Sequence, residues 1–109
     1  MPLDRDTAAV RIVREMKESE QAIADALVAT TSLFHSAAIA HRDVGGVPAP
    51  KSFAAFKRLQ NMTGSLIDTQ SEAARVHSIL LDIGIETGAF DEPTCPDQKS
   101  ASRDMTIAA

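Results

Sequence analysis

Apolar side chains recur at steps of three and four throughout residues 6–42, and no Gly or Pro interrupts them. This spacing places them along one side of a helix, which then packs against a neighbour. Asp4 or Asp6 can accept hydrogen bonds from the free amides of the first turn, as N-cap residues do. The members of this stripe are Val13, Met16, Ile23, Leu27, Thr30, Phe34 and Ala37, with Glu20 filling the one missing position.

A second stretch with the same spacing covers residues 51–87. The segment between the two stretches, residues 43–50, contains a Gly-Gly pair and two Pro residues, which is typical of a connector. Because the connector is short, we expect the second helix to return antiparallel to the first, and Pro50 or Ser52 can open it. Its stripe consists of Phe56, Leu59, Thr63, Leu66, Gln70, Ala73, His77 and Leu80.

The chain changes character after the second stretch. Gly88 is suited to end the helix as a C-cap, and Phe90 can fold back on the last turn. From residue 91 the composition turns to Asp, Pro, Ser, Lys and Thr. We therefore predict a helical hairpin domain over residues 1–90 and a polar C-terminal tail over residues 91–109. A single Cys, Cys95, excludes an internal disulfide.

Large apolar residues fall on nearly every side of the second helix over residues 76–85. A hairpin of two helices covers only one side, so a further neighbour is needed. The simplest neighbour is a second copy of the chain. We predict an all-α fold, an antiparallel hairpin of two long helices that completes a four-helix bundle as a homodimer. The predicted interface residues are Val76, Ile79, Leu80 and Ile83.

Small polar residues occur at the same level of both predicted helices, at residues 30–32 and 61–65. The favoured interpretation is a close crossing, in which the hydroxyls bond to carbonyls one turn earlier. Two alternatives remain. Gly64 can break the second helix, or the hydroxyls can line a small ligand cavity.

His77 is the candidate for chemistry inside the bundle. The antiparallel pairing places it near Glu15, Met16 or Glu20, and a His beside carboxylates suggests a metal or an acid–base role. However, the Glu-x-x-His spacing of di-metal bundles is absent. We favour a structural histidine and assign no catalytic, cofactor-binding or metal residue. A bundle that binds a metal or small ligand between its helices remains the alternative.

Charge is distributed unevenly along the hairpin. Residues 27–67 carry a net charge of +3, and the remainder carries −7, which gives the total of −4. Antiparallel assembly would lay each basic loop end over the acidic end of a partner. The same end could instead meet an acidic protein, or phosphate or nucleic acid through Arg42, Lys51, Lys57 and Arg58. Without a stacking platform or a recognition motif, we do not expect nucleic acid.

No catalytic motif stands out in the chain. The first residues lack the layout of a secretory signal, and no uninterrupted apolar stretch is long enough to span a bilayer. We therefore expect a cytoplasmic location, no membrane partner and no cofactor. The predicted function is that of a non-enzymatic oligomerisation or protein-interaction module, which holds a second copy or another protein.

Overall fold

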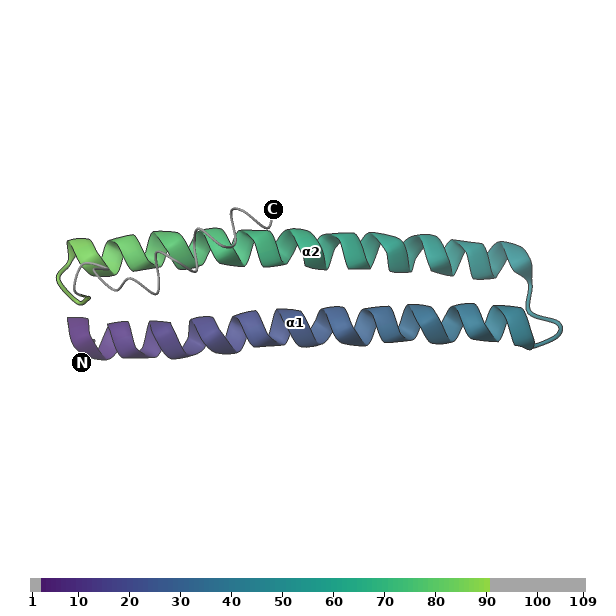
Figure 1. The fold of residues 1–109 in the computed structure, drawn as a ribbon, viewed down its shortest axis with the longest axis horizontal. Coiled ribbons are helices and arrows are strands. Elements are labelled where there is room, and N and C mark those ends of the chain that lie inside the picture. Colours follow the sequence, from purple (N-terminus) through teal and green to yellow (C-terminus); the bar gives the residue numbers. More distant parts are fainter. Residues whose placement is uncertain (1–2, 91–109) are drawn as a thin grey trace, which may run out of the picture.

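The computed structural model describes residues 3–90, and they form two long antiparallel α-helices (Figure 1). Helix α1 spans Arg5–Asp43 and helix α2 spans Ala49–Glu86. A loop joins them at one end, the loop end, and the start of α1 lies beside the end of α2 at the other, the open end (Figure 1). The predicted all-α hairpin is confirmed, and the predicted helix limits differ from the observed ones by two residues at most. The predicted tail over residues 91–109 lies outside the described residues.

Local interactions set where each helix begins. The carboxylate of Asp4 accepts a hydrogen bond from the backbone N–H of Thr7 at 2.8 Å, which confirms it as the N-cap of α1. The same bond lowers the pKa of Asp4, because it stabilises the ionised carboxylate. In the loop, Gly46 adopts a φ of 81°, a conformation that side chains disfavour. Pro50 lies in the first turn of α2, where its missing N–H has no helical partner to lose.

The end of α2 turns back on itself. Gly88 adopts a φ of 79°, and the backbone N–H of Phe90 then donates to the carbonyl of Gly84 at 3.0 Å. This turn lays the Phe90 ring against Gly84, as the sequence predicted. The Arg5 guanidinium donates to the carbonyl of Thr87 at 3.2 Å, so α1 also holds this turn. These contacts hold the two helices together at the open end, and the loop connects them at the other end.

A pair of glycine substitutions tests the Phe90 contact. A methyl group on Gly64 would meet open space, so Gly64→Ala should stabilise α2 by about 1 kcal/mol through helix propensity. A methyl group on Gly84 would overlap the Phe90 ring, so Gly84→Ala should lose that gain. Thermal unfolding followed by circular dichroism should show a higher melting temperature for Gly64→Ala only. An equal rise in both variants would show that Phe90 does not pack on Gly84.

The seam between the helices follows the predicted stripes closely. On α1 the side chains of the stripe are buried or partly buried, including Glu20. On α2 the prediction is wrong at Gln70 and His77, which are exposed. The remaining α2 members of the seam are Phe56, Leu59, Thr63, Leu66, Ala73 and Leu80.

The seam alone makes a very small core. Within residues 3–90, one apolar side chain is buried, that of Leu59 at 7 % exposure. One polar side chain, that of Thr30, is buried as well. Phe34 and Phe56 stack across the seam with their ring centroids 5.7 Å apart. By contrast, fourteen large apolar side chains of the described residues are exposed. The hairpin therefore leaves most of its apolar surface in water.

The small polar residues at mid-height lie in unbroken helix. The Thr31 hydroxyl donates to the carbonyl of Leu27 at 3.0 Å, and the Thr63 hydroxyl donates to that of Leu59 at 2.9 Å. These bonds to the preceding turn are those expected for a close crossing. The alternative of a break at Gly64 is wrong, because one Gly weakens a helix without removing any backbone hydrogen bond.

Candidate functional site

A shallow groove crosses one side of the hairpin at mid-height. It is an open hollow of about 420 Å³ with a mainly apolar lining. The hydroxyls of Thr31 and Thr63 are both bonded to carbonyls of their own helices, so they do not line it as free ligand donors. It is therefore a poor match for the predicted hydroxyl-lined cavity. The groove is lined by Thr31, Phe34, His35, Gln60, Thr63, Gly64 and Ile67.

The groove fixes which exposed residues share a side of the molecule. Each helical residue is rotated by about 100° from the one before it, so the two flanks of a stripe lie on opposite sides of the hairpin. Thr31 and Ile67 lie on the flanks next to the groove. Residues on the other flank of each stripe therefore lie on the side of the hairpin opposite the groove. Six large exposed side chains meet this condition, and we call them the apolar face. The apolar face consists of Ile12, Leu33, Met62, Val76, Ile79 and Ile83. The groove side carries four, which we call the groove face: Val10, Val28, Phe53 and Ile67.

Three of the four predicted interface residues belong to the apolar face. Val76, Ile79 and Ile83 are 49 %, 58 % and 48 % exposed in the single chain. Leu80 does not belong to it, because its side chain is partly buried in the seam with α1. Sequence reasoning missed Ile12, although a signal existed. It directly precedes a stripe residue, as Leu33 does, which places both on the same flank of α1.

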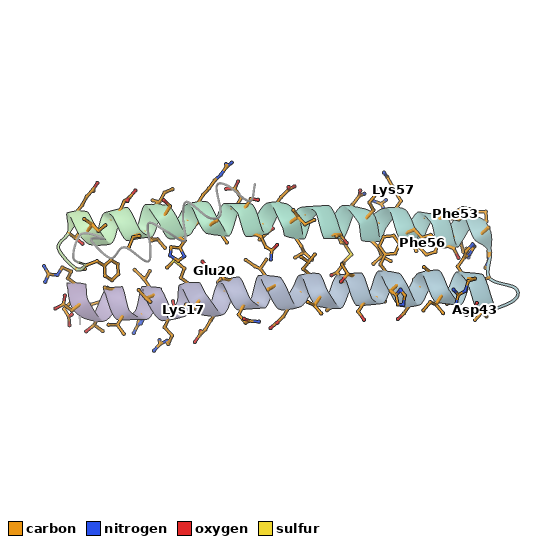
Figure 2. The ribbon with its side chains drawn as sticks, viewed as in Figure 1. Lys17, Glu20, Asp43, Phe53, Phe56 and Lys57 are labelled. Carbon is orange, nitrogen blue, oxygen red and sulfur yellow. The ribbon has the colours of Figure 1, made fainter. Side chains whose placement is uncertain are left out.

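His77 lies across the seam from Glu20. Its Nδ1 is 2.9 Å from the Glu20 carboxylate, and Figure 2 shows Glu20 on the side of α1 that faces α2. The predicted proximity to a carboxylate is confirmed for Glu20. Both side chains are more than a third exposed, so the pair contributes little to stability. Within residues 3–90 no three His, Cys, Asp or Glu side chains group as a metal site would require.

The loop end has a net positive charge, because its basic residues are opposed by Asp43 alone. Arg42 forms a two-pronged pair with Asp43 at 2.6 and 3.0 Å, which raises the pKa of Arg42 and lowers that of Asp43. Lys57 donates to the Gln60 side chain at 3.3 Å and points outward from α2 (Figure 2). Of the cations at the loop end, Lys51, Lys57 and Arg58 form no ion pair with a carboxylate of residues 3–90. Of the predicted contacts, Arg42 is therefore neutralised locally and the others are not.

Sequence reasoning also missed an aromatic cluster beside the loop. The ring of His41 lies 5.3 Å from that of Phe53 and 5.6 Å from that of Phe56. Its Nδ1 is buried without a hydrogen-bond partner among the described residues. In two antiparallel helices joined by a short loop, residues at similar distances before and after the loop lie side by side, so the sequence could have indicated these neighbours. The cluster packs aromatic rings of both helices together at the loop end, and it shields part of Phe53 on the groove face.

One property of α1 bears on the expected absence of a membrane partner. Within the part of the chain that the structure describes, α1 is long and apolar enough to cross a membrane by its length and composition. Counting uninterrupted apolar runs missed this, because isolated residues such as Thr30 and His35 interrupt the runs but lower the average only slightly. A helix buried inside a bundle has the same composition, so this property does not separate the two environments.

The described residues thus offer three surfaces for interaction. They are the apolar face, the basic loop end and the shallow groove, and the apolar face is the largest in exposed apolar side chains. Comparison with protein families, curated proteins and solved structures finds no match for the chain.

Proposed function

We propose that this chain is a non-enzymatic helical module that acts by association, and that a second copy completes a four-helix bundle with it. The observation that carries the proposal is the exposure of Val76, Ile79 and Ile83 to about half of their surface. Full burial of a large aliphatic side chain stabilises by roughly 1.5–3 kcal/mol. A second hairpin on the apolar face would supply that burial several times over.

The thinness of the core supports the same proposal. A single layer of two helices does not cover its own sides, and among the described residues Leu59 is the one apolar side chain buried between them. Stable helical proteins of this size place three or more helices around a shared core. Two copies related by a two-fold axis present the same face to each other, so one chain can supply both halves of the core.

The proposal assigns no catalytic residue, metal or cofactor. His77 and Glu20 are taken as a hydrogen-bonded pair across the seam, and the basic loop end is taken as a surface that directs association. Binding of another protein on the same apolar surface would serve the same class of function.

Light scattering coupled to size-exclusion chromatography tests the proposal. The chain should elute with a mass of about twice the 11.6 kDa of one copy, and its circular dichroism should show the two helices intact. A helical species with the mass of one copy would contradict it, because the apolar face would then be stable in water.

A further inference from the structure

We infer that the second copy docks antiparallel, apolar face against apolar face, so that each basic loop end lies beside the acidic open end of its partner. This inference rests on the proposed function and deepens it, because it specifies the partner, the face and the direction. Three independent features of the hairpin support it: the distribution of exposed apolar residues, the distribution of side-chain size and the distribution of charge.

The first feature selects the face. The apolar face carries six large exposed side chains and the groove face carries four. On the groove face, Phe53 already contacts the His41 ring. Phe90 folds against the open end beside Val10, where the two line a common hollow. The larger and less covered surface is the apolar face, so burying it against a partner removes more apolar area from water.

The second feature is side-chain size along the apolar face. Its open-end half carries four branched residues: Ile12, Val76, Ile79 and Ile83. Toward the loop, beyond Leu33 and Met62, the same flanks carry no large apolar residue, and small residues such as Ala40 and Ala55 stand at the corresponding positions. A parallel pair would oppose large with large at one end and Ala with Ala at the other, which leaves a gap. An antiparallel pair opposes large with small at both ends, so the helices can interdigitate at a uniform separation.

The positions of these residues along the helix axes agree with this antiparallel pairing. Residues 24 and 67 lie near the midpoints of α1 and α2. With a rise of about 1.5 Å per residue, Ile79 lies about 18 Å from the midpoint toward the open end. Ala55 lies about 18 Å from it toward the loop end, by the same rise. A two-fold axis through the middle of the hairpin therefore brings Ile79 of one copy to the level of Ala55 of the other.

The third feature is charge. The loop half, residues 27–67, carries +3, whereas the open half carries −2 over residues 3–26 and −3 over residues 68–90. Antiparallel docking sets opposite charges side by side at both ends, and parallel docking sets like charges together. Arg58 and Glu15 lie about 14 Å from the midpoint in opposite directions, so the two-fold axis brings them to one level. These charges are exposed, so they favour the antiparallel direction of docking but add little to the binding affinity.

Distances between spin labels on the two copies test the direction. The single Cys is first removed by Cys95→Ser, and a label is then attached in Ala54→Cys, an exposed position near the loop end. Antiparallel docking should separate the two labels by about 40 Å or more, twice the distance of Ala54 from the midpoint. Parallel docking should separate them only by the width of the bundle, about 25 Å or less. The matched control is Asp68→Cys, near the midpoint, where both directions give a short distance.

The outcomes distinguish the inference from the function on which it rests. A long distance for Ala54→Cys and a short one for Asp68→Cys, with a dimeric mass, is the expected result. A short distance at both positions with a dimeric mass would overturn the direction and leave the proposed association intact. The mass of one copy with no coupling between labels, in folded protein, would overturn both.

Discussion

Ile83→Asp should dissociate the assembly into single chains, while Ile67→Asp should leave it intact. The two isoleucines are 48 % and 51 % exposed in the single chain, so an aspartate is equally tolerable at either position of an isolated hairpin. They lie on different faces, and Ile83 also lies in the last turn of α2. An unpaired carboxylate buried by a partner costs roughly 3–5 kcal/mol, which weakens association by at least about 10²-fold. Light scattering at one fixed concentration compares the two variants directly.

This pair of variants also separates the two faces. Dissociation by Ile67→Asp alone would place the partner on the groove face instead. Dissociation by neither variant would mean that neither face is buried by association. Because both substitutions add the same charge at a helical position, a general effect of charge on solubility would appear equally in both.

Leu59→Ala should be the most destabilising conservative truncation within the hairpin itself. Leu59 is the one apolar side chain that the described chain buries, at 7 % exposure, and its removal leaves a cavity in the seam. Leu→Ala changes at buried positions cost about 2–5 kcal/mol, and we expect a value near 2–3 because the seam is open on both sides. Urea unfolding followed by circular dichroism gives this free energy.

The control for Leu59→Ala is Gln60→Ala, the next residue along α2, whose side chain is exposed. It should change the free energy of unfolding by less than about 0.5 kcal/mol. A loss below about 1 kcal/mol in Leu59→Ala would contradict the expected contribution of the seam to stability. The stability would then come almost wholly from contacts outside it.

The hairpin could be predicted because its determinants are local. The absence of Gly and Pro over residues 6–42, the Asp4 carboxylate and the Gly-Gly pair in the connector each act on the backbone beside them. The return of Phe90 onto the last turn is local as well, since the left-handed Gly88 directs it. Helix limits and turns therefore follow from neighbouring residues alone.

The errors arise where a polar side chain stands in an open seam. Gln70 and His77 lie at the predicted spacing on α2, yet both are exposed. Two helices leave the flanks of their seam uncovered, so a polar side chain within it keeps contact with water. The His77 ring does so while its Nδ1 contacts Glu20. The sequence predicts Leu80 both for the stripe and for the interface, and its partial burial places it in the seam. Spacing gives the stripe, but how far each member is covered depends on how the two helices pack.

The candidate site could likewise be predicted only in part. The proximity of His77 to Glu20 follows from antiparallel numbering, which needs only the position of the loop. The extent of the apolar face does not, because it requires knowing which flanks of α1 and α2 lie on one side of the molecule. Only the groove between Thr31 and Ile67 fixes that. A sequence search limited to residues 76–85 therefore found Val76, Ile79 and Ile83 and missed Met62 and both α1 members of the face.

The mass of the unmodified chain in solution, measured by light scattering along a dilution series, tests the central claim most directly. Our account predicts two copies per particle at micromolar concentration, with helix content falling as dilution separates them. Single copies that keep their full helix content across the series would show that one hairpin is stable with its apolar face in water, and would contradict the account.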